Sequence, residues 1–359
     1  MNIRIVFAVL IAFPVATQTL CAQHDEPAAP SVYKNLTTLL KDAPADQIGP
    51  SMQFITTSLG VECTFCHTTG KMEADDKPAK KTAREMITMT AEINRSHFGG
   101  RPQMTCYSCH RGSVRPVATP AVMDSDAPPT PPAPVAVAAV TPPATADQII
   151  EKYISALGGA DAMRKLTTRL MTGKILSGGT ETPIDVVTKA PNKRVSITHS
   201  NADSFTAFDG TAGWMGSTGR PARAMSAAES ASSALDSEFY LALRLKELYP
   251  QLRRSRPETI AGADCEVLNG TSAGHPPVRL YFDKGTGLLV RMVRFAETPL
   301  GRMPTQIDYA DYRATDGVKT PFRWTLSRPN GRFTIQIATV KNNAPVDDAR
   351  FAKPAGDVK

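Results

Sequence analysis

Residues 61–70 read VECTFCHTTG, and residues 104–111 read MTCYSCHR. In each stretch two cysteines lie three positions apart, and a histidine follows the second cysteine. This C-x-x-C-H pattern is the attachment signature of c-type haem. Two thiols at this spacing on a short helical turn can each add across a vinyl group of one porphyrin, and the next residue brings an imidazole nitrogen to the iron. The repeat therefore predicts a small haem-binding segment built around two attachment sites.

Two other chemistries use paired cysteines. A thioredoxin-like redox switch places its pair at a helix start within a βαβ unit, and no such pattern flanks either motif. A zinc site with four cysteines fits the spacing but leaves both histidines without a role. Haem is the interpretation that uses every residue of the pattern. The predicted haem residues are Cys63, Cys66, Cys106 and Cys109 for covalent attachment, and His67 and His110 as proximal iron ligands.

Haem iron in an electron carrier usually has a second axial ligand. A predicted helix before the first motif carries Met52, with Ile55 and Leu59 on the same face. A second predicted helix, within DDKPAKKTAREMITMTAEINRSHF at 75–98, carries Met86, Met89 and Ile93 along one stripe. Such stripes are usually core, and spacing alone does not separate a ligand from a packing residue.

Two details of the second helix follow from its first residues. Asp76 is expected to be its N-cap, and Pro78 is expected in its first turn. His97, near the far end, is an alternative donor to the iron, although a single histidine near a helix end is usually exposed.

The first residues predict export. MNIRIVFAVLIAFPVATQTLCAQ has one early arginine, then an apolar run, then small or polar residues, which is typical of a cleavable signal peptide over residues 1–22. Cleavage near Ala22 would remove Cys21. The bulky Leu20 before that cysteine disfavours a lipid anchor, so we expect a periplasmic or extracellular protein.

Composition divides the remaining chain. At 359 residues the chain suits two domains, and residues 117–145 are rich in proline and alanine, as a semi-rigid linker would be. This places a dihaem cytochrome domain at 30–116 and a second domain at 146–356. The net charge of +7 comes from scattered basic residues, so nucleic-acid binding is not expected.

The second domain is predicted to be an antiparallel β-rich α+β domain. A helix at 146–157 is followed by short alternating segments separated by turns, such as those at 283–287 and 328–331. One helical stretch, at 226–250, interrupts them. A curved half-barrel wrapped around a helix fits this order better than a two-sheet sandwich.

The second domain offers no catalytic constellation. We expect His199 and His275 to be isolated, Cys265 to be a buried free thiol, and Trp214 and Trp324 to belong to the core. In DYADYR, at 308–313, alternation predicts that the two tyrosines point to opposite faces of a half-exposed strand.

A family resemblance sharpens the first domain. The stretches MQFITTSLGVECTFCH, DDKPAKKTAREMITMTAEINRSHF and TCYSCHRGS resemble the cytochrome subunit of photosynthetic reaction centres, and more closely its stand-alone secreted relatives. The resemblance covers about residues 32–116. It implies that Met52 pairs with His67, that Met86 pairs with His110, and that Met89 packs. The family subunit typically carries four haems and this chain has two motifs, so docking to a reaction centre does not follow. The C-terminal part faintly resembles the half-barrels of periplasmic lipoprotein carriers, an analogy of fold with no motif behind it.

The leading hypothesis is an exported dihaem electron carrier that exchanges single electrons with redox partner proteins, membrane-associated donors or acceptors among them. Two haems with His/Met ligation leave no open iron site, which argues against an enzyme. The alternative makes the C-terminal domain a binding module for a lipid or another apolar ligand, with the cytochrome as its accessory. A redox enzyme would require a haem that neither methionine ligates.

Overall fold

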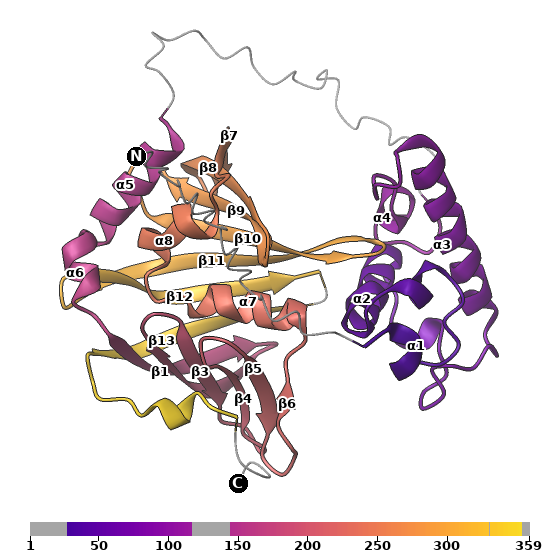
Figure 1. Cartoon of the computed structure of the whole chain (residues 1–359), viewed down its shortest axis with the longest axis horizontal. Coiled ribbons are helices and arrows are strands. Elements are labelled where there is room, and N and C mark those ends of the chain that lie inside the picture. Colours follow the sequence, from indigo (N-terminus) through magenta and orange to yellow (C-terminus); the bar gives the residue numbers. More distant parts are fainter. Residues whose placement is uncertain (1–26, 117–143, 330, 354–359) are drawn as a thin grey trace, which may run out of the picture.

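The computed structural model describes residues 27–116, 144–329 and 331–353. The first of these ranges is helical, as the sequence predicts, and lies to the right in Figure 1. None of the helices in the described part of the chain has the length and apolarity of a membrane span. The elements of the first range are α1 (Ala29–Val32), α2 (Ile48–Leu59), α3 (Pro78–His97) and α4 (Cys106–His110), with short 3₁₀ turns at Leu39–Asp42, Ala45–Gln47 and Cys63–Phe65.

Helix α3 begins where proline permits it. Pro78 occupies the first turn, where a missing N–H costs nothing, as predicted. The predicted N-cap is wrong: the residue at the cap is Lys77, and no side chain caps the helix. Asp76 instead accepts a hydrogen bond of 2.7 Å from the hydroxyl of Thr68, so its carboxylate braces the turn after the first motif.

The end of α2 brings the two motifs together. Gly60 caps the helix in the left-handed conformation, with φ of 68°. A Cβ atom at this position would lie 2.2 Å from the carbonyl oxygen of Gly112. The N–H of Gly112 donates to the carbonyl of Ser58 at 2.9 Å. The chain just after the second motif is therefore joined directly to the helix just before the first.

The second part of the chain is one antiparallel sheet of 13 strands, in the order β6-β5-β4-β3-β2-β1-β13-β12-β11-β10-β9-β8-β7. Strands that are neighbours in sequence pair with each other, except β6 and β7, which lie at the two edges of the sheet, and β1 also pairs with β13. The strands are β1 (Thr168–Ser177), β2 (Thr180–Lys189), β3 (Lys193–Thr198), β4 (Ser204–Phe208), β5 (Gly213–Ser217), β6 (Arg223–Ala224), β7 (Arg253–Ile260), β8 (Ala263–Ser272), β9 (His275–Asp283), β10 (Leu289–Thr298), β11 (Gly301–Thr315), β12 (Val318–Arg328) and β13 (Gly331–Asn342).

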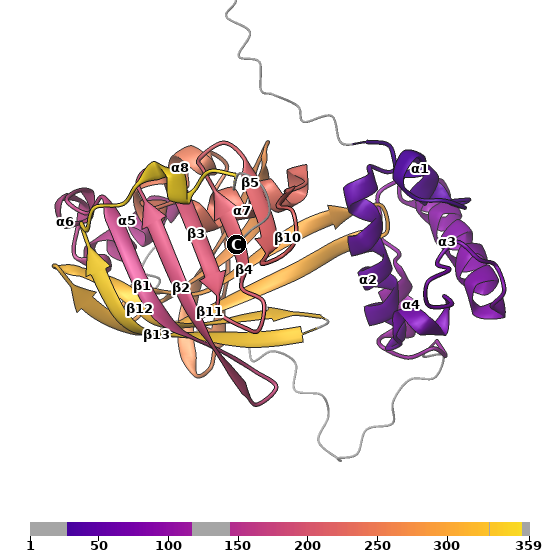
Figure 2. The same ribbon diagram turned by 90° about the horizontal axis from the view of Figure 1, so that it is seen from below.

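Helices cover one face of this sheet (Figures 1 and 2). They are α5 (Ala146–Leu157), α6 (Ala160–Arg164), α7 (Ala227–Ser237) and α8 (Leu241–Leu248). The largest core cluster joins α5 and α8 to strands β8 to β12, through side chains such as Tyr153, Leu245 and Phe282. The predicted half-barrel around a helix is confirmed. Both predicted hairpin turns are also confirmed, between β9 and β10 and between β12 and β13.

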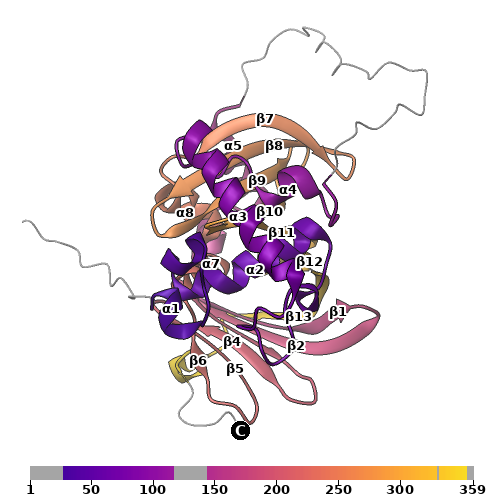
Figure 3. The ribbon, with the colours of Figure 1, turned by 90° about the vertical axis from the view of Figure 1, so that its right-hand side faces the viewer.

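The β10–β11 hairpin leaves the sheet and reaches the helical part of the chain, as Figures 1 and 2 show. At its tip, Leu300 and Met303 are only 7% and 8% exposed, because they join the core cluster of α2 and α3 that contains Phe54 and Ile87. A Cβ atom on Gly301 would lie 2.9 Å from the Phe54 ring. The helical part of the chain therefore shares part of its core with the sheet. Figure 3, viewed from the side of the helices, shows α2 and α3 in front of this hairpin.

Several side chains of the second part can be compared with expectation. Cys265 is fully buried in β8 and free, and Trp324 packs in the core, both as predicted. The alternation through DYADYR is wrong, because Asp311 has φ of 55° and breaks it, so that Tyr309 and Tyr312 pack against the same cluster. His199 is not isolated either.

The His199 ring lies between two carboxylates. Its Nδ1 is 3.0 Å from Asp203, and its Nε2 is 3.2 Å from Asp185. These two partners raise the pKa of His199. The predicted signal peptide, Cys21, and almost all of the predicted linker lie outside the described residues.

Candidate haem sites

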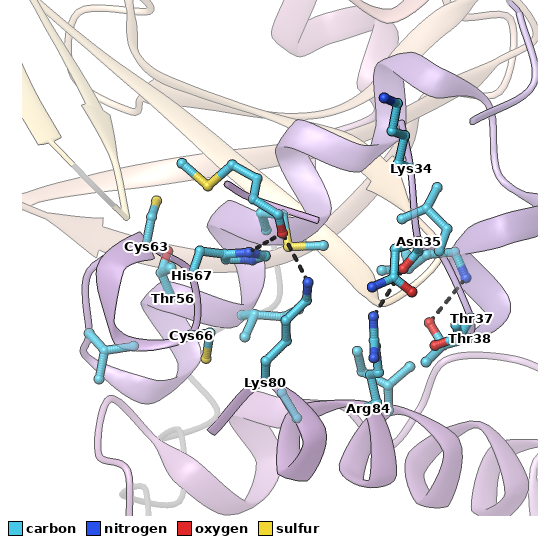
Figure 4. Close-up of a pocket in the computed structure, with 18 of the residues that line it drawn as sticks. Lys34, Asn35, Thr37, Thr38, Thr56, Cys63, Cys66, His67, Lys80 and Arg84 are labelled. Atoms are coloured by element: carbon cyan, nitrogen blue, oxygen red, sulfur yellow. Dashed lines mark hydrogen bonds between the residues drawn. The ribbon is translucent and has the colours of Figure 1, made fainter. Parts of the chain in front are cut away.

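The first C-x-x-C-H motif lies at a cavity between α2 and α3. Cys63, Cys66 and His67 line it, and so does Met52 from α2. The empty space between the walls is about 770 Å³, part of it open to solvent. Figure 4 shows the three motif residues on one side of the cavity, with Lys80 rising from α3. The tertiary structure therefore brings the predicted thiols, the proximal histidine and the predicted distal methionine to one space.

His67 is already oriented for a metal. Its Nδ1 lies 2.8 Å from the carbonyl oxygen of Met72, an acceptor to which Lys80 Nζ also donates, at 2.9 Å. A carbonyl accepts only from a protonated nitrogen, so this contact selects the tautomer with hydrogen on Nδ1. The lone pair then resides on Nε2, the nitrogen that would bind iron.

The second motif has the same construction. Cys106, Cys109 and His110 line a second cavity, together with Met86 and Met89 of α3. The empty space here is about 940 Å³, again partly open. His110 Nδ1 lies 3.0 Å from the carbonyl oxygen of Ser113, which again leaves Nε2 for a metal.

Helix α4 holds the second motif in register. The side chains of Thr105 and Ser108 each bond the other residue's backbone N–H, which is a capping box. Asn94 of α3 is buried, donates to the carbonyl of Met104 at 2.7 Å, and accepts from its N–H at 2.9 Å. The segment that enters α4 is therefore fixed to the helix that carries Met86.

The two cavities are neighbours with a common wall. Ile55 of α2, Cys66, and Ala83 and Ile87 of α3 line both of them. Ile55 and Ile87 are buried. Groups bound in the two cavities would thus be separated by little more than side chains.

The exposed apolar side chains test whether a porphyrin fits. Phe65, Met72, Met89 and Val114 are between 44% and 51% exposed, and each lines one of the two cavities. Exposed apolar surface that gathers at a cavity marks a place where a ligand covers it. The planar, mostly apolar face of a haem would cover these side chains, while His67 and His110 would supply imidazole nitrogen to the iron. The residues present fit haem in both cavities.

The thiols and charges agree with this fit. All five cysteines of the described chain are free, and burial raises the pKa of Cys66 and Cys106, so that both stay protonated near neutral pH. Hydrogen bonds from Arg84 and other neighbours hold the pKa of Asp75 well below its usual range. Within the described residues, no group of three or more His, Cys, Asp or Glu side chains converges as a metal site would require.

The structure also shows one residue that the sequence argument missed, Met72, and a cavity position for Met89, to which the resemblance gave a packing role. Met72 lines the first cavity as Met52 does, and Met89 lines the second together with Met86. The motif pattern carries no signal for Met72, because it lies in the loop after the histidine. His97 is exposed and lies at neither cavity.

The N-terminal part of the chain is similar in sequence to known proteins. Residues 6–143 match the family model described as photosynthetic reaction centre cytochrome C subunit. The N-terminal part of this chain resembles that family. The photosynthetic reaction center cytochrome c subunit from Thermochromatium tepidum is 31% identical to this chain over 100 residues, which is 26% of this chain and 24% of the relative. The Rubrivivax gelatinosus subunit is 31% identical over 108 residues, which is 29% of this chain and 28% of the relative. The chain thus spans about a quarter of the length of the curated relatives it matches, and the likeness implies c-type haem.

Solved structures resemble the other part of the chain. A DUF1329 family protein from Desulfovibrio piger, 13% identical, matches 57% of this chain and 96% of its own, with a TM-score of 0.41. A LolA superfamily protein from Nitrosomonas europaea, 12% identical, matches 58% of this chain and 98% of its own, also with a TM-score of 0.41. At this level of likeness nothing follows about ligand or activity.

Proposed function

We propose that this protein is an exported dihaem c-type cytochrome that carries single electrons between redox partner proteins. Cys63 and Cys66 would attach one haem, and Cys106 and Cys109 the other. In this proposal residues 1–22 are a signal peptide, 30–116 the dihaem domain, 117–145 a linker and 146–356 the sheet domain. The protein would act in the periplasm or outside the cell without a lipid anchor.

One observation carries the proposal: in each cavity a motif histidine has its Nδ1 engaged by a backbone carbonyl, and a methionine from a helix lines the same space. His67 and His110 would be the proximal ligands, and Met52 and Met86 the distal ones. A bound haem supplies a one-electron couple, and thioether ligation raises its potential relative to two histidines.

The chain's own residues would do the rest. The carbonyls of Met72 and Ser113 fix the imidazole tautomer, and buried Ile55 and Ile87 keep water out of the shared wall. Because both axial positions would be filled by the protein, the site favours electron transfer over substrate chemistry. The shared wall supports transfer between the two cavities, and a donor or acceptor, membrane-associated or not, would approach from their exposed side.

The test is the intact mass and the spectrum of exported protein. Two covalent haems are expected, together with a far-red methionine–iron band in the oxidised state. Met52→Leu and Met86→Leu should each remove part of that band, whereas the matched variants Met72→Leu and Met89→Leu should keep it. No added mass would refute the haem assignment. If the band is lost in the Met72→Leu and Met89→Leu variants instead, Met72 and Met89 are the distal ligands in place of Met52 and Met86.

A second candidate function belongs to the sheet domain, which we propose as a binding module for an apolar ligand. The observation that favours it is a further cavity, about 1210 Å³ of empty space partly open to solvent, between the sheet and the end of α7. Organic extraction of purified protein followed by mass spectrometry tests this function. A stoichiometric apolar compound is the expected result, and protein that neither carries nor takes up any such compound would refute it.

A further inference from the structure

The cavity of the sheet domain has a polar end made by a row of side chains across three strands. Arg169 of β1 pairs with Thr188 of β2, and Thr188 pairs with Arg194 of β3. All three side chains line the cavity. Since neighbouring strands lie about 4.8 Å apart, the two arginine backbones are roughly 10 Å from each other. Two long guanidinium side chains therefore flank one space from opposite sides.

The carboxylates at this cavity already have partners. Glu238 accepts two hydrogen bonds from Arg244, at 2.7 and 2.9 Å, and Asp236 forms an ion pair with the buried Arg294. Arg194 has no hydrogen bond or ion pair from its side chain within the described residues, although it feels the charge of Asp236.

Arg169 donates to Asn342 at 3.1 Å and lies over the Phe239 ring, 5.2 Å from its centre. Both of its contacts are neutral. Arg244 and Arg294 already neutralise the two carboxylates at this end of the cavity, so the charges of Arg169 and Arg194 have no carboxylate of their own.

Removing a charge from water without a counter-ion is unfavourable, which is why ions inside proteins are normally paired. Arg169 and Arg194 are both partly buried, and desolvation lowers the pKa of each guanidinium. Arginine nevertheless keeps its charge at neutral pH in proteins. An anion between them would remove the cost and gain charge-assisted hydrogen bonds.

The cavity is long, and its wall along β1, β12 and β13 is mainly apolar. It runs along β1 from Arg169 to Ile175, six residues or roughly 20 Å, and Ile175 pairs with Ile335 of β13. Trp324 and Leu326 of β12 line the same space. Hydroxyl side chains form another part of the wall: those of Ser196 and Thr198 on β3 and Thr206 on β4. Thr320 of β12 lines the cavity too, and its buried Oγ1 has no hydrogen-bond partner in the described chain.

We propose that this cavity binds an anionic amphiphile, with its carboxylate or phosphate between Arg169 and Arg194 and its hydrocarbon chain along β1 toward Ile175. The inference rests on the proposed apolar-ligand function of the sheet domain and adds the charge of the ligand. It does not depend on the haem assignment.

The test compares three probes of equal chain length on the full-length holoprotein, after extraction of any resident compound: dodecanoate, dodecyl phosphate and dodecanol. Equilibrium dialysis measures binding. At least one of the two anions should bind about tenfold more tightly than the alcohol, a difference of about 1.4 kcal/mol, because charge-assisted hydrogen bonds are stronger than those to a neutral hydroxyl. The tighter anion identifies carboxylate or phosphate as the natural head group.

Variants locate the site. Arg194→Gln and Arg169→Gln should each remove most of the tenfold preference, and Arg332→Gln, at an exposed position of β13 outside the cavity, should leave it unchanged. The far-ultraviolet spectrum verifies folding, and if one variant fails to fold, the other variant and the wild-type comparison decide.

The failures are distinguishable. Equal binding of the anions and dodecanol would overturn the charge proposal and keep the apolar-ligand function. Binding of none of the three probes would overturn both. A preference that survives in both folded cavity variants would place the anion elsewhere and overturn the site.

Discussion

The contact between the β10–β11 hairpin and the helical domain, residues 27–116, gives a quantitative prediction. Leu300 lies at the hairpin tip, 7% exposed, inside the core cluster that also contains Phe54 and Ile87. A Leu→Ala change in a core costs about 2–5 kcal/mol, and we take the lower end because a contact between two domains can relax. The hairpin binds only the folded helical domain, so Leu300→Ala should lower that domain's stability by about 2 kcal/mol.

Heat unfolding with two probes measures this effect. Soret absorbance follows the helical domain, and far-ultraviolet circular dichroism follows mainly the sheet. For a domain of this size a loss of 1 kcal/mol lowers the midpoint by about 4–8 °C, so the Soret midpoint should fall by roughly 8–16 °C. The sheet keeps its own core, and its midpoint should move much less.

Arg302→Ala is the matched control, because Arg302 lies at the same tip with its side chain 60% exposed and paired with exposed Glu297. Removing a surface ion pair changes stability by about 0–1 kcal/mol. If Leu300→Ala shifts the Soret midpoint no more than Arg302→Ala, the hairpin does not support the helical domain in solution. If both probes shift equally, the two parts unfold as one unit, and the reasoning about separate domains is wrong.

Two further variants test other contacts. Gly60→Ala should lower the free energy of unfolding of the helical domain, measured in urea, by more than about 1–2 kcal/mol. An alanine there is strained at φ of 68°, and its Cβ would lie 2.2 Å from the Gly112 carbonyl oxygen. The control is Gly49→Ala, which should not destabilise the domain because nothing lies within 4 Å of the new methyl group. A similar loss in both glycine variants would contradict the close approach. His199→Gln should lower stability in acid only, because the flanking aspartates raise the pKa of His199. The protonated ring stabilises the fold fully at pH values below the unfolded pKa of histidine, about 6.5. That stabilisation is lost as the pH rises through the higher pKa of His199 in the folded protein. Urea midpoints that differ equally at about pH 5.5 and about pH 8.5 would contradict the role of the aspartates.

Local signals explain why so much of the fold was predictable. The first turn of α3 follows from Pro78, since proline restricts backbone angles by its own covalent structure. The hairpin turns follow for the same reason. The error at Asp76 is also local, because Thr68 competes for its carboxylate from the far side of a loop.

Some features of the candidate haem sites could be predicted from local sequence, and others could not. Spacing predicts the cysteines and histidines, because attachment chemistry acts within one helical turn. Spacing does not reveal the Met72 carbonyl that orients His67, nor that Met72 and Met89 line the same cavities as Met52 and Met86. Those relations depend on how loops fold back, which no period in the sequence encodes.

The sequence by itself determined two attachment motifs, a helical segment around them and an antiparallel sheet after a proline-rich stretch, because these depend on covalent chemistry, periodicity and turn residues. Only the tertiary structure decided that the hairpin tip at Leu300 enters the core beside α2, and that Arg169 and Arg194 line one cavity. Both are contacts between residues far apart along the chain. They exist because burying apolar surface brings distant segments together, and local sequence patterns do not specify which segments will meet.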